Sequence, residues 1–216
     1  MSRPPSPPAA AVFDCDGLLI DTEPLWTIAE NALFARYGRV FSPDGKRALL
    51  GTTGDAAGRV LARLLDQPER GRELLAELVE LVDVELGAAR PMPGVLELLA
   101  GLDGRLPIAA ASNSPRRLLR RSLEGSGLHD RFPTILTSDD VANPKPAPDL
   151  YVAACARLGA SPSQAIALED SPTGVAAARA AGLWVIGVPS YPGVVLDADL
   201  VVPSLSAPEV LAALTG

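Results

Sequence analysis

Two aspartates near the start of the chain, Asp14 and Asp16, stand where a short apolar segment ends. Residues 9–13 are apolar and short enough to form a buried parallel strand, and Gly17 follows the second aspartate. Ligands of open α/β sheets bind beyond the carboxyl ends of the strands, so carboxylates at this position are suited to chemistry. The alternative is a turn in which aspartate only bonds its own backbone.

Polar side chains also follow two further expected strands. Ser112 and Asn113 come after the strand of residues 107–111, where their hydroxyl, amide and backbone N–H groups could bind an anion or simply cap a helix. Lys145 lies between two prolines, after the next strand and its loop. Such a rigid segment favours either an ammonium group held in place or a solvated charge on a turn.

Two more acids, Glu169 and Asp170, follow the expected strand of residues 165–168. With Asp14 and Asp16 they would bring four carboxylates to one edge of a parallel sheet. Unit charges ~4 Å apart repel by roughly 4 kcal/mol at an effective dielectric constant of 20, so a cation must offset them. Oxygen ligands match Mg²⁺, which shares its coordination with substrate phosphate. The acids, the lysine and the anion-binding segment together predict a phosphoryl-transfer site.

The order of the elements predicts an α/β fold with a helical insertion. Helical periodicity dominates residues 24–89, with four helices expected at residues 25–37, 43–50, 55–65 and 72–86. After residue 94 strands alternate with helices, which indicates a parallel sheet covered on both faces. The expected strands are residues 9–13, 107–111, 134–137, 165–168, 183–188 and 200–202, and the expected helices are residues 95–102, 115–124, 146–158 and 173–181.

The first strand must pair within this sheet, because a lone strand beside helices would leave its backbone unpaired. We therefore expect an α/β core domain of residues 1–23 and 90–216 and a helical domain of residues 24–89 inserted into it.

Composition narrows the class of protein. The net charge of -7 disfavours nucleic acid or an anionic membrane as the main partner, because both need a basic face. Cys15 and Cys155 lie far apart without metal-ligand spacing, which is typical of a reduced, cytoplasmic protein. The apolar segments are too short to span a membrane. We expect a monomer, and the predicted phosphoryl-transfer site indicates a small phosphorylated metabolite as its substrate.

The polar segments resemble, in order, the four motifs of the haloacid dehalogenase (HAD) superfamily. The segments are Asp14-Cys15-Asp16-Gly17, Ser112-Asn113, Lys145 and Glu169-Asp170, and the resemblance spans residues 12–188. It implies a Rossmann-like parallel sheet core, and the helical insertion resembles the C1 cap of this superfamily. The segment Asp21-Thr22-Glu23-Pro24-Leu25-Trp26 resembles the branch of small-sugar phosphatases that also contains β-phosphoglucomutase.

The resemblance implies a role for each motif. Asp14 would be the nucleophile and would form an aspartyl phosphate, while Asp16 would act as general acid and then general base. Phosphoryl oxygens would be bound by Ser112, Asn113 and Lys145. Mg²⁺ would be held by Asp14, the backbone carbonyl of Asp16, and Asp170, with Glu169 as a further ligand or just behind the ligands.

The helical insertion is expected to contact the leaving group of the substrate. The candidate residues are Glu23, Trp26, Gly51, Thr52 and Thr53, together with Arg116 of the core. The loop of residues 51–54 carries hydroxyls and no charge, which favours a neutral sugar or polyol with one phosphate. The sequence thus predicts a Mg²⁺-dependent phosphatase of sugar or sugar-alcohol phosphates.

Three alternatives remain beside this prediction. The resembled mutase branch has a histidine and flanking basic residues where this chain has Trp26, Leu50 and Gly54, which disfavours a phosphomutase. Dehalogenation needs the first aspartate alone, so Asp16 argues against it. A non-catalytic protein that binds a phosphorylated ligand is expected to have lost a motif residue, and every motif is complete here.

Overall fold

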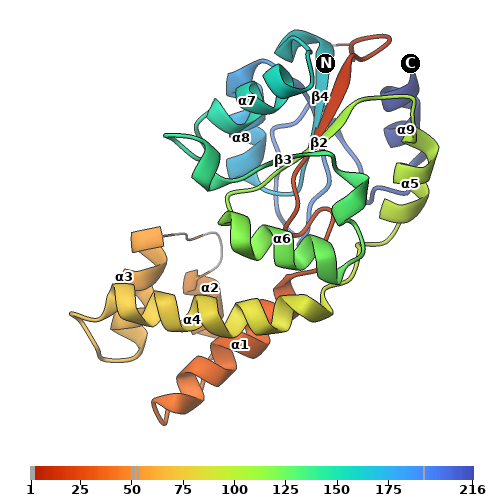
Figure 1. Ribbon diagram of the computed structural model, residues 1–216. Coiled ribbons are helices and arrows are strands. Elements are labelled where there is room, and N and C mark those ends of the chain that lie inside the picture. Colours follow the sequence, from red (N-terminus) through yellow and green to blue (C-terminus); the bar gives the residue numbers. More distant parts are fainter. Residues whose placement is uncertain (1–2, 50–51, 53, 192) are drawn as a thin grey trace. The chain divides into compact units, whose positions relative to one another are not determined.

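The computed structural model describes residues 3–49, 52, 54–191 and 193–216 of the chain. It divides into two compact units, one of Met1–Asp21 with Arg90–Gly216 and the other of Thr22–Ala89. The first unit contains the sheet and the second is helical (Figure 1). The domain boundary expected after residue 23 falls in the first turn of α1 (Glu23–Arg36).

The first unit is built on a parallel sheet of six strands in the order β3-β2-β1-β4-β5-β6. The strands are β1 (Ala10–Phe13), β2 (Ile108–Ala111), β3 (Thr134–Leu136), β4 (Ala165–Glu169), β5 (Trp184–Gly187) and β6 (Leu200–Val201). Each lies where an apolar segment predicted it, and the α/β fold class is confirmed.

Helices cover both faces of this sheet, as the view in Figure 1 shows. On one face α7 (Asp149–Arg157) packs beside α8 (Pro172–Ala181). On the other, α5 (Val95–Leu102) packs beside α9 (Pro208–Thr215), and α6 (Arg116–Gly125) connects β2 to β3. Short 3-10 helices lie at Leu86–Ala88, His129–Arg131, Ser138–Asp140 and Pro162–Gln164.

The core follows from alternation along the strands. Ala10 and Val12 of β1 point into one buried cluster with Leu150 and Ala154 of α7. On β1 the next residue, Phe13, packs edge-on against Phe132, with ring centroids 5.8 Å apart. Because β1 is buried on both faces, its sequence is apolar at every position, as expected for a central parallel strand.

The connection order reverses beside β1. From β1 the chain moves to β2 and then β3 on one side, whereas β4 returns to the other side of β1 and β5 and β6 follow it outward. Ligands of open α/β sheets bind beyond the carboxyl ends of the strands at such a reversal. The segments that follow β1, β2 and β4 therefore meet at the position where chemistry is expected.

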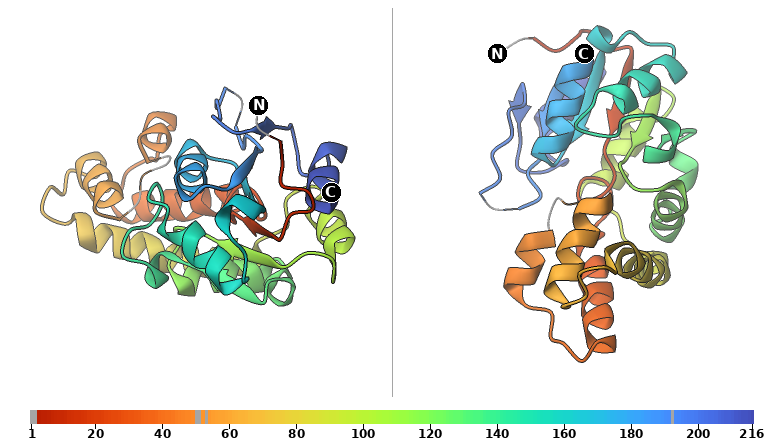
Figure 2. Two further views of the ribbon diagram at one scale, coloured as in Figure 1. Left: turned by 90° about the horizontal axis from the view of Figure 1, so that it is seen from above. Right: turned by 90° about the vertical axis from the view of Figure 1, so that its left-hand side faces the viewer.

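In the described part of the second unit, seen from two further directions in Figure 2, the α-helices are α1, α2 (Pro43–Leu49), α3 (Gly54–Leu64) and α4 (Gly71–Glu85). Two glycines bring α3 and α4 together, because a Cβ built on Gly71 would lie 2.8 Å from the carbonyl oxygen of Gly58. Just before α2, the ring of Phe41 contacts that of Phe34 at a tilt of 51°, with centroids 4.7 Å apart. All four helices correspond to periodic segments of the sequence.

Two details of the helices differ from expectation. The helix expected from residue 146 begins at Asp149, because a residue before proline is disfavoured in helical conformation and Ala147 precedes Pro148. The final helix α9 was absent from the expected elements. Among the helices of the described residues, none has the length and apolar character needed to cross a membrane.

Candidate active site

The aspartate loop begins where β1 ends, and its backbone shape is fixed by neighbouring strands. The Asp14 N–H donates to the carbonyl of Leu168 at 3.0 Å, so Asp14 is still paired with β4. Gly17 then adopts a positive φ of 88°, and a Cβ at this position would lie 2.4 Å from Oδ2 of Asp170. A glycine is therefore required for the chain to turn here and for the Asp170 carboxylate to approach the loop.

Lys145 directs its ammonium group into the same place. Its Nζ donates to Oδ1 of Asp14 at 2.6 Å, to Oε1 of Glu169 at 2.6 Å and to the carbonyl oxygen of Ala111 at 2.8 Å. The side chain is only 4% exposed, and all three of its N–H donors have an oxygen acceptor. This lysine is thus a buried partner of two carboxylates.

The backbone of Lys145 is held by the side chain of Asn113. The Lys145 N–H donates to Oδ1 of Asn113 at 2.8 Å, and Nδ2 of Asn113 donates to the Lys145 carbonyl at 2.9 Å. Asn113 follows β2, whereas Lys145 precedes α7, so this pair of hydrogen bonds joins two loops at the sheet edge. In this structure the amide of Asn113 positions the lysine.

Two serines hold the second aspartate. Oγ of Ser112 donates to Oδ2 of Asp16 at 2.9 Å, and Oγ of Ser114 donates to the same oxygen at 2.8 Å. Oγ of Ser112 also accepts from the backbone N–H of Ser114 at 3.0 Å. The loops after β1 and β2 are joined through the Asp16 carboxylate.

Glu169 ends β4 and is completely buried. Its Oε1 accepts from Lys145 and also from the hydroxyl of Tyr151, while its Oε2 accepts from Oγ of Ser171 at 3.3 Å. A Cβ built on Gly174 would lie 1.9 Å from the Glu169 carboxyl carbon. The carboxylate is therefore fixed by three donors and by the first turn of α8.

The electrostatics of this cluster are dominated by burial and by repulsion among the acids. Burial raises the pKa of Asp14 well above its ordinary value, and Glu169 and Asp170 raise it further while Lys145 opposes them. Burial and the charge of Glu169 raise the pKa of Asp170 to about 7. Burial acts to lower the pKa of Lys145, but Asp14 and Glu169 outweigh it and raise that pKa.

The donor set fits a divalent cation. Asp14, Glu169 and Asp170 each offer a carboxylate oxygen, and these oxygens lie within 4.8 Å of one another. The ammonium group of Lys145 pairs with Asp14 and Glu169, and the three buried carboxylates, when ionised, would carry more negative charge than it offsets. Oxygen ligands of this kind suit Mg²⁺, and a cation would relieve the repulsion that raises the two aspartate pKa values.

The groups that meet here are those that phosphoryl transfer uses. They are a carboxylate at the reversal of the strand order, an ammonium group beside it and a cation site of oxygen ligands. The comparisons with known proteins agree with this chemistry. The model of the haloacid dehalogenase-like hydrolases matches residues 8–182. The chain belongs to this family.

Relatives of this chain are named as phosphatases. It is 33% identical over 195 residues to hexitol phosphatase B of Escherichia coli, covering 84% of this chain and 83% of that protein. It is 32% identical over 178 residues to the phosphorylated carbohydrates phosphatase of Thermotoga maritima, covering 81% and 82% of the two chains. The family and these relatives together show that the HAD-like chain is a phosphoric monoester hydrolase.

Solved structures agree on the fold. CbbY of Rhodobacter sphaeroides, in complex with phosphate, is 28% identical to this chain with a TM-score of 0.81, covering 96% of this chain and 99% of CbbY. The resemblance to the HAD superfamily that the four motifs predicted is confirmed.

The residues predicted to contact substrate from the helical unit lie in and near its first helices. Glu23 begins α1 and forms an ion pair with Lys46, which also binds Oε2 of Glu30 at 2.7 Å. Trp26 is half-buried on α1, and Oγ1 of Thr52 donates to the carbonyl of Leu49 at 2.7 Å. Gly51 and Thr53 lie outside the described residues. Substrate contact by these five residues stays a prediction.

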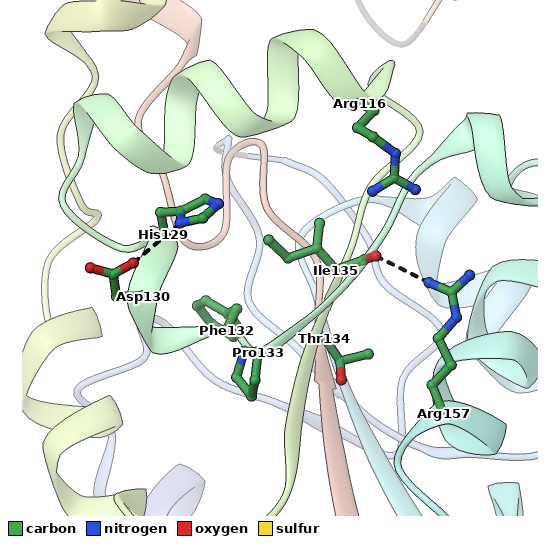
Figure 3. A pocket seen from close by; sticks show the side chains of 8 residues that line it. All are labelled: Arg116, His129, Asp130, Phe132, Pro133, Thr134, Ile135 and Arg157. Carbon is green, nitrogen blue, oxygen red and sulfur yellow. Dashed lines mark hydrogen bonds and ion pairs between the residues drawn. The ribbon is translucent and has the colours of Figure 1, made fainter.

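Arg116 points into a pocket along the edge strand β3 (Figure 3). The pocket has a volume of about 530 Å³ and is lined by Arg116, Arg157, His129 and neighbouring residues of β3. Arg116 donates to Oδ2 of Asp140 at 2.5 Å, and Arg157 donates to Oδ1 of the same aspartate at 3.1 Å. None of the carboxylates that surround Lys145 lines this pocket.

Several residues of the site were missed by sequence reasoning. They are Ser114, Tyr151, Gly174 and Ser190, the last of which hydrogen-bonds the Asp170 carboxylate. Ser114 stands one residue beyond a predicted motif and could have been included on that ground. No local pattern marks Tyr151, which lies on an ordinary amphipathic helix and reaches the site only through the packing of α7.

Proposed function

We propose that the protein is a Mg²⁺-dependent phosphatase that hydrolyses sugar or sugar-alcohol phosphates through an aspartyl phosphate on Asp14. The observation that supports this most strongly is the short contact between Oδ1 of Asp14 and Nζ of Lys145 at 2.6 Å, inside a cluster of oxygen ligands. The ammonium group stabilises the ionised carboxylate, which is the nucleophilic form.

In the first step a carboxylate oxygen of Asp14 forms a bond to phosphorus while the bond from phosphorus to the ester oxygen breaks. Asp16 gives its proton to the departing oxygen, so the alcohol leaves neutral. In the second step a water oxygen bonds to phosphorus as Asp16 takes a proton from the water, and the bond between Asp14 and phosphorus breaks. Free phosphate leaves and Asp14 is regenerated.

The loops around Asp14 support these steps in distinct ways. The hydroxyls of Ser112 and Ser114 hold the Asp16 carboxylate, which fixes the group that transfers protons. Lys145 lies against the nucleophile and would balance the negative charge that develops on the phosphoryl oxygens. The side chain of Asn113 holds the backbone of Lys145 through two hydrogen bonds and so fixes the position of the lysine.

Mg²⁺ would be held by Asp14, Asp170 and the backbone carbonyl of Asp16, with Glu169 as a further ligand or just behind them. It would supply a positive charge that binds phosphoryl oxygens and offsets the excess of acids. The support for this assignment is the cluster of carboxylate oxygens within 4.8 Å and the raised pKa values of Asp14 and Asp170.

The proposed substrate class rests on the relatives and on the absence of charged residues from the loop of residues 51–54, which is expected to contact the substrate. A hexitol phosphatase and a carbohydrate phosphatase each match more than four-fifths of this chain, and CbbY has also been solved with xylulose-(1,5)bisphosphate. We propose that Glu23, Trp26 and the loop of residues 51–53 contact the sugar hydroxyls. Arg116 would contact the substrate only by leaving its ion pair with Asp140.

The test is phosphate release from a panel of phosphomonoesters, with Mg²⁺ and with EDTA. The panel contains hexose and hexitol phosphates, phosphoglycolate, a nucleotide monophosphate and β-glucose 1-phosphate, and for the last the isomer is also followed. Release from hexose or hexitol phosphates that stops in EDTA is expected. Isomerisation without release would instead indicate a mutase, and silence across the panel would refute the proposed substrate class.

A further inference from the structure

Tyr151 lies beneath the site on α7 and has no exposed surface. Its hydroxyl donates to Oε1 of Glu169, and the face of its ring lies against Lys145, with Nζ 5.0 Å from the ring centroid. A phenylalanine could fill nearly the same volume of the core. The hydroxyl therefore needs an explanation other than packing, because burying it without a partner would be unfavourable.

The ammonium group of Lys145 is shared between two carboxylates at equal distances. Nζ lies 2.6 Å from Oδ1 of Asp14 and 2.6 Å from Oε1 of Glu169. Its position between them depends on how strongly each carboxylate attracts it. Any change in the donors to Glu169 will therefore shift the ammonium group relative to the nucleophile.

Tyr151 is the second donor to the Glu169 oxygen that binds the lysine. When the hydroxyl donates, part of the negative charge on Oε1 is satisfied and Glu169 attracts the ammonium group less strongly. The aromatic ring of Tyr151 also favours a cation at the position of Nζ, because an aromatic face attracts positive charge. Both effects leave the ammonium group free to remain on Asp14.

We propose that Tyr151 is a positioning residue for phosphoryl transfer: through Glu169 and through its ring, it holds the ammonium group of Lys145 against Asp14. This inference rests on the proposed function, in which Asp14 is the nucleophile. Without the hydroxyl, Lys145 moves toward Glu169, and both the nucleophile and the developing phosphoryl charge lose their cation.

The chain offers a matched control in its helical unit. The hydroxyl of Tyr37 donates to Oε1 of Glu77 at 2.8 Å, and the guanidinium carbon of Arg70 lies 5.7 Å from the Tyr37 ring centroid. The same three kinds of group thus meet at a place to which no catalytic role is assigned. Tyr37→Phe removes a hydroxyl with the same kinds of partner at a part-buried position, and it reports the effect of such a loss outside the site.

The experiment compares Tyr151→Phe and Tyr37→Phe with the wild-type protein. Initial rates are measured with p-nitrophenyl phosphate and Mg²⁺, and thermal unfolding is recorded for each protein. Tyr151→Phe is expected to lower kcat by about 10- to 100-fold with KM within about twofold, because a displaced catalytic group costs rate without costing binding. Tyr37→Phe is expected to leave both constants within about twofold of wild type. An unchanged kcat in Tyr151→Phe, or a change confined to KM, would overturn the proposal.

A crystal structure of Tyr151→Phe supplies a readout that does not depend on activity. We expect the separation between Nζ of Lys145 and Oδ1 of Asp14 to exceed hydrogen-bonding distance, with Nζ closer to Glu169. An unchanged separation would overturn the inference. If the wild-type protein hydrolyses no phosphomonoester, the proposed function fails, and this structure still decides whether Tyr151 positions the lysine.

A second comparison tests whether the hydroxyl of Tyr151 acts through Glu169. Glu169→Gln removes the charge through which the hydroxyl acts, so the double variant Tyr151→Phe/Glu169→Gln is compared with Glu169→Gln alone. The separation between Lys145 and Asp14 is expected to be the same in the two crystal structures. A lysine that moves only in the double variant would show that the hydroxyl does not act through Glu169, and the proposal would be wrong.

Discussion

Replacing Gly174 by alanine should destabilise the protein at the acidic cluster. An added Cβ would lie 1.9 Å from both the carboxyl carbon and Oε1 of Glu169 and 2.0 Å from Oε2. Glu169 has no exposed surface and accepts hydrogen bonds from Lys145 and Tyr151, so its carboxylate cannot move aside without breaking one. Alanine alone would favour the helix by about 1 kcal/mol.

The destabilising effects of the added methyl group are larger than this gain in helix propensity. Overpacking of a core costs about 1–3 kcal/mol, and a lost hydrogen bond to a buried charged group costs about 1.5–3 kcal/mol. We therefore expect Gly174→Ala to lower the free energy of unfolding by about 2–4 kcal/mol, which for a chain of this size lowers Tm by about 4–16 °C. Its kcat should also fall, because the displaced Glu169 carries Lys145 with it.

The control for this variant is Gly101→Ala on α5. There an added Cβ would lie 3.2 Å from Cδ1 of Leu211, which is the flexible end of a side chain. We expect this variant to change the free energy of unfolding by less than about 1 kcal/mol. Urea and thermal unfolding measure both proteins. A Gly174→Ala protein as stable as the wild type would refute the claim that the helix start fixes the Glu169 carboxylate.

Three further predictions concern the surroundings of Lys145. Metal-free wild-type protein should lose stability as pH rises from about 4 to about 7. Folding raises the pKa of Asp170 from 3.8 to about 7. The folded state therefore binds more protons than the unfolded state in that pH window, and its stability falls as pH rises. In EDTA at pH 8, Asp170→Asn should consequently be more stable than wild type, by at most about 4 kcal/mol, and the gain should vanish near pH 4; a gain that is constant with pH would contradict this. Asn113→Ala removes two hydrogen bonds to the Lys145 backbone, so it should lower the free energy of unfolding by about 1–3 kcal/mol and lower kcat. Its control, Asn143→Ala, removes one exposed hydrogen bond to Asp149 and should lower that free energy by less than about 1 kcal/mol. Equal losses of stability in urea unfolding would count against the positioning role of Asn113. Asp170→Ala should raise the Mg²⁺ concentration for half-maximal activity by about 10-fold or more, and an unchanged Mg²⁺ titration would exclude Asp170 as a ligand.

The fold was readable from the sequence because its strands are short, apolar and separated by amphipathic helices. β1, for example, is apolar at all its positions and is followed directly by Asp14, so both its burial and its place before the site are visible in the local sequence. Near proline the boundaries depend on backbone restrictions that the apolar pattern does not contain, and α7 begins later than that pattern predicted. The spatial order of the strands came only from the structure, since it depends on packing across the sheet.

Part of the site could also be predicted from the positions of the strands in the sequence. Residues that follow strand ends, such as Asp14 and Lys145, occupy positions where the topology of a parallel sheet brings them together. The residues that hold them lie on other elements and reach the site by tertiary packing. Tyr151 approaches from the buried side of α7, and Gly174 matters for the atoms it lacks, so neither has a chemical signature in the sequence.

The central claim is that Asp14 carries the phosphoryl group. The most direct measurement is to quench the protein with acid during turnover of its best substrate with Mg²⁺ and to locate phosphorylated residues by mass spectrometry after reduction of the acyl phosphate with borohydride. We predict modification at Asp14 in the wild-type protein, and in Asp14→Asn no modification and a loss of turnover of at least about 10³-fold with the fold intact. Ordinary phosphate release by Asp14→Asn, or a phosphoryl group trapped on another residue, would contradict the account.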